Sequence, residues 1–574
     1  MYRFAALFGD SLVANPDQIS ESLRATGLTA VLAHERFALY ASADTPVTRL
    51  HTRALLIGHA FRRADGTALT GSSHSIIPAG FDPSRYLIEQ CWGDYILLVF
   101  PTDDYAKFNA IRDPSGGLAC VYSIASGFVT SDISTVIDAG LLRRTVDWGF
   151  IKGNLIYPHL KTGSTGLSNV SELLPGHRLR ISGEAGTTDE LWNPWTYATR
   201  DQRHRSAPEA AAAVRSAVTK AVGAWADTDR DVLLELSGGL DSSIVAACLR
   251  NSKARVTCCN LVTAVPGADE RDYAVAMSDL LGQDLHVRTL RVEDAEFDFP
   301  PPSNAVAPST WFLQNAANKL KEAIGREHGV RSFFSGGGGD TAFGYIKTAA
   351  PAADAYRERG LLAAARAVRD LAELHQCTFW KASRLTARKL LAPAKSPRAP
   401  DLSFVRDTAH RSAANLHPWF TSPPDSLPGD RERIFDLAGA QIFRDGVARS
   451  ATSHLRMPLL SQPVVEACLR VPSWMWIEGG RNRSVARSAF VDDLPAKILH
   501  RRSKGTFMNY SGAVYRRNKH LLRDYLLRGS LEGHGLLDAP ALQRFFDRRH
   551  DDLDDGFMRI FDLCSIENWV RHQT

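Results

Sequence analysis

The chain has 574 residues, enough for roughly two to four domains that each bury a core. Hydrophobic residues make up 44% of the chain and charged residues 23%, which excludes a wholly disordered protein and a coiled coil. The surplus of Lys and Arg over Asp and Glu is only +5, so the charge gives no reason to expect a nucleic-acid partner.

The apolar stretches are strand-length. None approaches the roughly 18 residues of a membrane span, and Asp10 interrupts the first apolar run too early for a signal peptide. We therefore expect a cytoplasmic protein without a membrane span. The eight cysteines lie mostly inside apolar stretches and show no CxxC spacing, which favours buried thiols over a metal or redox site.

Up to about Trp192, short apolar runs alternate with Gly, Pro and Asp turns, which predicts a strand-rich first domain over residues 1–192. Residues 193–206 are polar, basic and proline-containing, so we place the domain boundary there. After an alanine-rich helix, strands and helices alternate, which indicates a mostly parallel, helix-covered sheet in a second domain over residues 206–574. The part beyond Lys347 is expected to be largely helical.

Residues 355–411 differ from the rest in charge. They hold twelve Lys or Arg against five Asp or Glu, whereas the remainder of the chain is slightly acidic. We expect a basic helical insertion. Its charge indicates either a solvated helical face or a docking surface for an acidic peptide or protein.

Residues 233–244 read LLELSGGLDSSI, a buried strand that runs through a Gly-rich turn directly into a helix. This geometry presents backbone N–H groups and the positive end of a helix dipole to an anion. Glycines allow close approach to phosphate, and the serine hydroxyls add donors. A Walker A lysine is absent, so the loop suits pyrophosphate held by N–H groups and Mg²⁺, with Asp241 as a candidate metal ligand.

This loop resembles the pyrophosphate loop of the ATP-pyrophosphatase superfamily, whose members cleave ATP between the α and β phosphates to adenylate a substrate. Within it, the chain is similar to the asparagine-synthetase group over most of its length. Residues 333–345, which include SGGGGD and FGY, resemble that group's second nucleotide loop, SGxGxDxxFGGY. The resemblance implies that Asp340 shares Mg²⁺ with Asp241. The implied ATP- and pyrophosphate-binding residues are Leu236, Ser237, Gly238, Gly239, Asp241, Ser242, Ser243, Ser335, Gly336 and Arg483.

Three further segments carry the same resemblance. Residues 269–274 resemble the group's DExxxA segment, residues 456–460 its RVPFL segment, and residues 483–495 its KxxLRxxxxxxLP segment, with Arg483 where a phosphate-binding lysine is usual. Residues 501–507, RRSKGTF, resemble the catalytic R-x-K-x-x-F element. This implies that Lys504 places a positive charge on the reacting phosphate and on the oxyanion of the acyl transfer. Lys504, Asp241 and Asp340 form the implied catalytic set.

The first domain resembles a glutamine-amidotransferase domain with an αββα fold, through GDY at 93–95, RDPSG at 112–116 and LPGH at 174–177. In that family, glutamine hydrolysis depends on a cysteine that becomes the first residue after Met removal. Here Tyr2 follows Met1, and the first cysteine is Cys91. We expect an α/β protein in which a degenerate, Ntn-amidotransferase-like αββα domain precedes an ATP-pyrophosphatase, adenine-nucleotide-α-hydrolase-like synthetase domain.

Adenylating loops without an ammonia source suggest that the nucleophile is an amine of the substrate itself. DERDYA, RRSKGTF, Tyr2 and the basic insertion together resemble a lasso-peptide cyclase. The resemblance implies ATP and Mg²⁺ as cofactors and a leader-cleaved core peptide as substrate. The Asp or Glu side chain of that peptide would be adenylated and joined to its N-terminal amine. A leader peptidase and a leader-binding element are the implied protein partners.

Three alternatives stay open. One is a β-lactam-synthetase-like small-molecule cyclase, which also uses an amine of its substrate and needs no ammonia. An asparagine-synthetase-like amide ligase fits less well, because His454 replaces the group's Glu before Leu455-Arg456 and Ser461 replaces a terminal Asp. A non-catalytic peptide-binding scaffold would not need intact phosphate loops. Gly337, where relatives carry Glu or Tyr, favours a roomy pocket for a peptide.

Overall fold

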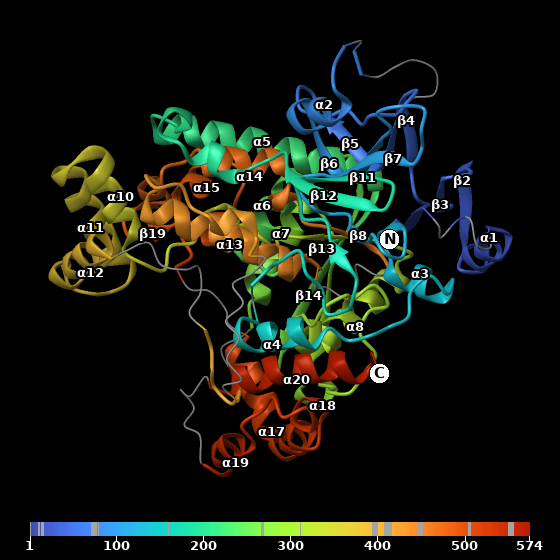
Figure 1. Cartoon of the computed structure of the whole chain (residues 1–574). Coiled ribbons are helices and arrows are strands. Elements are labelled where there is room, and N and C mark those ends of the chain that lie inside the picture. Colours follow the sequence, from blue (N-terminus) through green and yellow to red (C-terminus); the bar gives the residue numbers. More distant parts are fainter. Residues whose placement is uncertain are drawn as a thin grey trace.

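The computed structural model shows a mixed α/β protein (Figure 1). The residues that it describes are 2–9, 12, 16–70, 77–78, 80–158, 160–265, 269–309, 311–392, 400–406, 416–445, 452–502, 507–548 and 556–573.

Two six-stranded antiparallel sheets form the first part of the chain. The first sheet has the order β10 (Ser171–Glu172), β8 (Val121–Ser123), β9 (Phe128–Thr130), β1 (Phe4–Phe8), β3 (Phe37–Ser42), β2 (Leu28–His34). The second has the order β12 (Ala185–Glu190), β11 (His177–Ser182), β7 (Lys107–Arg112), β6 (Cys91–Val99), β5 (Ala54–Arg62), β4 (Val47–His51).

The two sheets pack face to face, with helices outside both. Phe4 and Phe8 of β1 belong to the core between the sheets, whereas Ala5 and Leu7 point to the opposite face, as the two-residue period of a strand requires. On that outer face lie α1 (Pro16–Ala25) and α3 (Ile133–Asp138), and α2 (Pro83–Gln90) covers the outer face of the second sheet. This layering is consistent with the expected αββα arrangement.

Residues 193–206 connect the two-sheet part to a long helix. They form two short 3₁₀ helices, η2 (Pro194–Ala198) and η3 (Arg200–Gln202). Ser206 caps the start of the helix α5 (Ala207–Asp229): its side chain accepts a hydrogen bond of 3.3 Å from the backbone N–H of Glu209. A serine at this position satisfies a helix N–H that would otherwise lack a partner.

A five-stranded parallel sheet forms the second part, as the sequence predicts. Its order is β15 (Leu285–Leu290), β14 (Arg255–Thr263), β13 (Asp231–Glu235), β16 (Ser332–Ser335), β17 (His454–Arg456). Val232 and Leu234 pack in the core cluster that holds residues of α5, α6 (Leu240–Leu249) and α7 (Arg271–Leu281). Leu233 points to the other face, into the cluster with α8 (Trp311–Glu327) and α13 (Pro428–Asp445).

The chain beyond Lys347 is largely helical, which confirms the expectation. The other helices, 3₁₀ turns and short strands are α4 (Trp148–Ile156), η4 (Val292–Asp294), α9 (Gly339–Ala342), α10 (Ala350–Arg359), α11 (Leu361–Leu374), α12 (Phe379–Leu391), η5 (Pro418–Phe420), η7 (Pro458–Leu460), α14 (Gln462–Leu469), η8 (Ser473–Trp476), β18 (Ile477–Glu478), β19 (Arg481–Asn482), α15 (Ser484–Ala489), α16 (Ala496–Leu499), α17 (Met508–Leu527), α18 (Ser530–Gly533), α19 (Ala539–Asp547) and α20 (Phe557–Arg571).

The structure bears on the helical insertion, on the cysteines and on the search for a membrane span. The helical insertion begins at Ala350, before the basic segment 355–411, and its last helix ends at Leu391. Residues 400–406 are not helical, and residues 393–399 and 407–415 lie outside the described part. All eight cysteines are free thiols and seven are buried, as expected. No helix in the described ranges has the length and apolar character needed to cross a bilayer.

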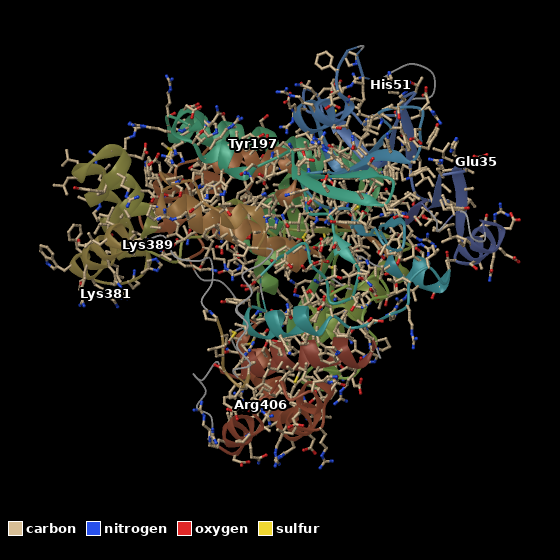
Figure 2. All side chains as sticks on the ribbon, in the orientation of Figure 1. Glu35, His51, Tyr197, Lys381, Lys389 and Arg406 are labelled. Carbon is tan, nitrogen blue, oxygen red and sulfur yellow. The ribbon has the colours of Figure 1, made fainter. Side chains whose placement is uncertain are left out.

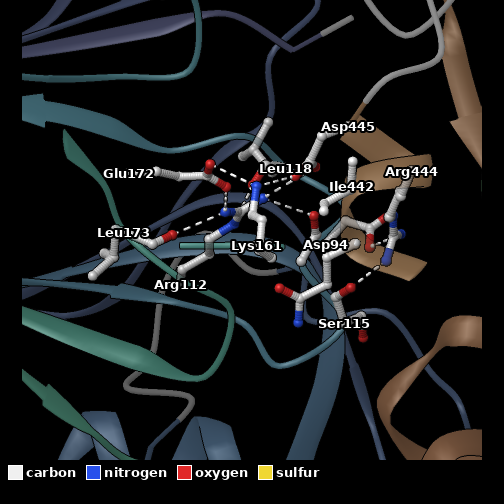
Figure 3. A network of polar contacts seen from close by, with 12 residues as sticks. Asp94, Arg112, Ser115, Leu118, Lys161, Glu172, Leu173, Ile442, Arg444 and Asp445 are labelled. Atoms are coloured by element: carbon white, nitrogen blue, oxygen red, sulfur yellow. Dashed lines mark hydrogen bonds and ion pairs between the residues drawn. The ribbon is translucent and has the colours of Figure 1, made fainter. Parts of the chain in front are cut away.

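Buried charges join the two parts of the chain. Figure 3 shows Lys161 between Glu172 and Asp445, with its Nζ 2.6 Å from a carboxylate oxygen of each. Arg444 of α13 donates to Asp94 of β6 at 3.1 Å. These contacts pair a cation from one part with a carboxylate from the other, so they fix how the parts meet.

Arg456, the last residue of β17, is a second such junction. Its guanidinium donates to both carboxylate oxygens of Asp229 at 2.8 and 3.0 Å, and to Asp94 at 3.2 Å. It also lies 3.8 Å from the ring centroid of Trp225. Burial tends to raise the pKa of Asp229, but the Arg456 charge and the hydrogen bonds from Arg456 and Ser332 together outweigh burial and lower that pKa.

The Asp229→Asn variant tests this junction. It leaves the buried Arg456 with one carboxylate partner fewer, so we expect the free energy of unfolding to fall by about 3 kcal/mol. The control is Asp231→Asn, because Asp231 pairs with Arg255 where both side chains are largely exposed, at 48% and 70%. Urea titration measures the free energy of unfolding of both variants, and that of Asp231→Asn should fall by less than about 1 kcal/mol. Equal losses would contradict a structural role for the buried pair.

Candidate active site

The candidate site lies at the carboxyl ends of β13 and β16. In sheet order, β14 and β15 continue to one side of β13, and β16 and β17 continue to the other. The loops after β13 and β16 therefore diverge at a topological switch point, which is where open parallel sheets bind ligands. The two Gly-rich loops singled out in the sequence are these two loops.

The first loop, residues 236–239, runs from β13 into α6. Gly238 has φ +71°, a backbone conformation that favours glycine, and a Cβ there would lie 2.5 Å from the Cβ of Tyr273. The Ser237 hydroxyl accepts from the N–H of Gly239 at 3.3 Å and lies 3.1 Å from the Ser242 hydroxyl. The loop is thereby folded over the N-terminus of a ten-residue helix, which is a suitable place for phosphate.

The second loop, residues 336–338, repeats this local structure. The Ser335 hydroxyl accepts from the N–H of Gly337 at 3.1 Å. A Cβ on Gly336 would lie 2.5 Å from the backbone N of Ser242, and a Cβ on Gly339 would lie 2.5 Å from the Cγ of Asp241. Glycine at both positions lets the second loop lie directly against the beginning of α6, so the two loops form one continuous surface.

Arg483 joins the two predicted metal ligands. Its Nη1 atom donates to Asp241 Oδ1 and to Asp340 Oδ1, each at 2.8 Å. The residue has φ +58° and is buried, and its guanidinium lies 5.3 Å from the ring centroid of Tyr345. Asn482 holds this turn, since its side-chain amide exchanges hydrogen bonds of 3.0 and 3.1 Å with the backbone of Ile346.

The two carboxylates fit a magnesium ion that also binds phosphate. Both lie within hydrogen-bond length of one Arg483 nitrogen, so they are close to each other, and the Asp340 side chain is 40% exposed to solvent. Mg²⁺ commonly uses one or two protein carboxylates together with substrate phosphates and water. The described residues contain no cluster of three or more His, Cys, Asp or Glu that would form a complete protein site. A Mg²⁺ ion here would therefore depend on the nucleotide for its other ligands.

The remaining loop residues take different places. The N–H of Leu236 donates to Cys259 at 2.8 Å and its carbonyl accepts from the Asn260 amide at 2.7 Å, so its backbone groups are engaged with β14. The Ser242 hydroxyl donates to the Gly239 carbonyl at 3.2 Å. Ser243 is buried, and its hydroxyl has no hydrogen-bond partner among the described residues.

Lys504 lies outside the described residues, as do its neighbours 503–506. The chain that leads to it is held next to the first loop. Arg501 donates to the Gly238 carbonyl at 3.2 Å, pairs with Glu270, and lies 4.0 Å from the ring centroid of Tyr273. Arg501, three residues before Lys504 in the sequence, therefore lies beside the predicted phosphate loop.

The sequence did not reveal two features of this anchor. One is the pairing of Glu270 with Arg501, which explains why an acidic residue in the DERDYA segment matters for the loop. The other is Arg487, which donates to the carbonyls of Ile498, Leu499 and Arg501. Burial and the charge of Arg483 lower the pKa of Arg487 to about 10. Arg487 and Arg501 both lie in segments that resemble the asparagine-synthetase group. This resemblance was the only signal in the sequence that pointed to these two residues.

The space beside Gly337 is filled, so the expected roomy pocket at that position is wrong. A Cβ on Gly337 would lie 3.3 Å from the Met457 sulfur and 3.4 Å from Phe443. A separate cavity of about 140 Å³ lies between the two parts of the chain. Its walls include Leu118, Phe150, Lys161, Val306, Ile442 and Asp445. A cavity of this size holds about one benzene-sized group, so it can accept one side chain and not a folded peptide.

Tyr2, where the sequence resemblance leads one to expect a cysteine, is a buried core residue. Its hydroxyl lies 2.7 Å from His59 Nε2, and its ring centroid lies 4.5 Å from that of His454. Burial, reinforced by the positive charge of Arg456, lowers the pKa of His59 to about 4 and that of His454 to about 3. The place where a thiol nucleophile would act is occupied by a packed aromatic side chain among neutral histidines.

Comparison with known protein families matches residues 213–571 to asparagine synthase. The match covers more than half of the chain, and the chain belongs to the asparagine synthase family. It includes both nucleotide loops, Arg483 and Arg501. Because this is a family of ATP-dependent amide ligases, the match supports an enzyme that uses ATP to form an amide. Comparison with curated proteins gave no match.

The Gly336→Ala variant tests the contact between the loops. Its Cβ would meet the backbone of Ser242 at 2.5 Å, so the loops must separate, and we expect ATP affinity to fall by at least about tenfold. The control is Gly337→Ala in the same loop. Its Cβ would meet only the ends of Met457 and Phe443, which can move, so affinity should change by less than about twofold. Calorimetry with an ATP analogue that resists cleavage between the α and β phosphates measures both. Similar affinities for the two variants would count against the loop contact.

The buried histidines make stability depend on pH. Between about pH 6.5 and pH 4 the unfolded chain protonates His59 while the folded chain keeps it neutral, so acid favours unfolding. From pH 7 to pH 5 the wild-type protein should lose about 2 kcal/mol more stability than His59→Asn. His51→Asn, at an exposed histidine, is the control and should follow the wild type. If urea titrations gave parallel pH profiles for wild type and His59→Asn, His59 would not be held neutral in the folded state.

Proposed function

We propose that this protein is a lasso-peptide macrocyclase, an ATP-dependent enzyme that joins an Asp or Glu side chain of a core peptide to the peptide's own N-terminal amine. One combination of features carries the proposal. The aspartates of both nucleotide loops meet at Arg483, whereas Tyr2 is buried where a glutaminase nucleophile is expected. An amide ligase that has adenylating loops and no ammonia source needs an amine that its substrate already carries.

The proposed reaction has two steps. A carboxylate oxygen of the core peptide attacks the α-phosphorus of ATP, and pyrophosphate leaves. The N-terminal amine then attacks the acyl carbon, AMP leaves, and a proton is lost as the isopeptide bond forms. Holding the amine against the activated carbonyl can lower the barrier by roughly 7–11 kcal/mol at the upper end.

The residues of the site have distinct roles in this proposal. The N–H groups of the first loop and the N-terminus of α6 hold the leaving pyrophosphate. Asp241 and Asp340 hold Mg²⁺, which supplies positive charge to the phosphates when bound. Lys504 stabilises the charge that develops on the phosphate and on the oxyanion. Arg483 keeps the two aspartates together before the nucleotide binds.

The substrate is a core peptide from which the leader has been removed. A leader peptidase and a leader-binding element are the proposed protein partners, by resemblance to lasso-peptide systems. The cavity between the two parts of the chain is large enough to receive one side chain of such a peptide, beside Lys161 and Asp445.

Incubation with a core peptide, ATP and Mg²⁺ tests the proposal. We expect the peptide to lose the mass of one water while AMP and pyrophosphate accumulate, and Asp241→Asn to abolish both changes. Asp231→Asn, which changes an exposed carboxylate at the opposite, amino end of β13, is the control and should retain turnover. Formation of ADP in place of AMP would contradict adenylation.

The same assay separates the alternatives. Asparagine formed from free aspartate and ammonium would favour an asparagine-synthetase-like ligase, and closure of a small β-amino acid would favour a β-lactam-type enzyme. Glutamine should not be consumed, because Tyr2 is no nucleophile for its amide. Consumption of glutamine together with product formation would refute the proposed source of nitrogen.

A further inference from the structure

The helices α10, α11 and α12 form a unit that projects from one end of the molecule (Figure 1). They pack on one another, and the unit is attached through contacts of α10 with α13 and η8 and of α11 with β18. On α12, Ala382 and Thr386 face inward and are buried. Because these two positions lie one helical turn apart, the opposite side of α12 faces outward.

The outward side of α12 mixes arginine with large apolar side chains. We call it the α12 stripe, and its members are Trp380, Lys381, Arg384, Leu385, Arg388 and Leu391. Trp380 is 79% exposed and Leu391 is 85% exposed, values that are unusual for side chains of this size. Figure 2 shows Lys381 at the outer edge of this unit, and Lys389 closer to the body of the molecule. Lys389 pairs with Glu432 of α13 and is not part of the stripe.

Further exposed apolar side chains lie at one end of the stripe. Arg357 of α10 donates to the Leu390 carbonyl at 3.3 Å, so the C-terminal ends of α10 and α12 are adjacent. Leu361 and Leu362, which follow α10, are 73% and 79% exposed. These leucines extend the apolar surface beyond the stripe.

The acidic residues of the unit are turned toward the protein. Asp354 is buried and Glu358 pairs with Arg203 at 3.1 Å. Asp370 accepts from the N–H of Gly479 at 3.2 Å, and Glu373 pairs with Arg502 at 3.3 Å. By contrast, Lys381, Arg384 and Arg388 form no ion pair with any described residue. The exposed charge of the unit is therefore positive.

We propose that the α12 stripe, with Leu361 and Leu362, docks an acidic segment of a partner protein that carries apolar side chains between its carboxylates. Complementary charge orients such a segment, and Trp and Arg are the residues that contribute most at protein interfaces. Two of the three basic residues in the stripe are arginines. The arginine side chain suits paired contacts with carboxylates better than lysine does. The proposal is independent of the reaction at the nucleotide loops.

The observations favour a protein over a membrane or a nucleic acid. An amphipathic helix that lies on a membrane separates its apolar and basic faces. In α12 the two kinds of residue alternate along one stripe, and the only uncharged side is already buried against α10 and α11. A nucleic acid would bind the arginines but would leave the exposed leucines in water.

The test measures binding of labelled peptides to the full chain by fluorescence anisotropy. The probe is a short synthetic peptide that alternates Glu and Leu. The comparison peptides are polyglutamate of the same length and the same pattern with Lys in place of Glu. We expect the Glu/Leu peptide to bind most tightly, polyglutamate more weakly, the Lys peptide not at all, and added salt to weaken binding.

Variants of the stripe locate the binding. The double variant Arg384→Glu/Arg388→Glu should weaken binding by at least about tenfold, and Trp380→Ala by at least about fivefold. Lys107→Glu/Lys253→Glu and Phe81→Ala change exposed residues elsewhere and should have no effect. Nucleotide binding by the stripe variants should equal that of the wild type, so failure here is distinguishable from failure of the proposed function.

Three results would overturn the proposal. One is equal binding of polyglutamate and of the Glu/Leu peptide, which would leave no role for the apolar residues. The second is unchanged binding of the Glu/Leu peptide by both stripe variants, or no binding at all. The third is tighter binding to phosphatidylglycerol-containing vesicles or to a single-stranded oligonucleotide, which would assign the surface to another class of partner.

Discussion

The contact of Gly336 with the backbone of Asp241 and Ser242 sets the geometry of the candidate site. A side chain at position 336 would require space that the start of α6 already occupies. Because β13 and β16 are neighbouring parallel strands, their loops leave the sheet side by side, and this contact removes the remaining gap. Only then can one Arg483 nitrogen reach the carboxylates of both loops. The geometry of the candidate site thus depends on the two loops together.

Buried charges join the two-sheet part to the parallel sheet that carries this site. Arg456 ends the strand next to β16, and its carboxylate partners come from α5 and from the two-sheet part. Lys161 makes the reverse pairing, in which the two-sheet part supplies the cation and α13 supplies the carboxylate of Asp445. Buried ion pairs of this kind lose much stability when one partner is removed, so they resist separation of the parts. Tyr2 packs into the same junction. The two-sheet part therefore contributes buried contacts to the sheet that carries the candidate site.

Local patterns in the sequence predicted the strands, the parallel sheet and the first loop, because alternation and glycine spacing are local properties. The second loop and Arg483 were found by resemblance. The contact of Arg483 with two aspartates was not predictable, since it requires a left-handed turn held by Asn482 on Ile346, far away in sequence. The insertion begins before the basic segment because its first turns are buried and contain no basic residue, so positive charge could not mark their start. The space at Gly337 was misjudged because Met457 comes from a distant strand end.

The most direct test of the central claim follows the oxygen atoms of the substrate carboxylate. A core peptide whose acceptor Asp or Glu carries ¹⁸O in both side-chain oxygens is converted with unlabelled ATP, and the nucleotide product is analysed by mass spectrometry. If the carboxylate is adenylated and then displaced by the peptide's amine, each AMP carries one ¹⁸O and the ring amide retains the other. Unlabelled AMP, or ¹⁸O in inorganic phosphate released beside ADP, would contradict the account.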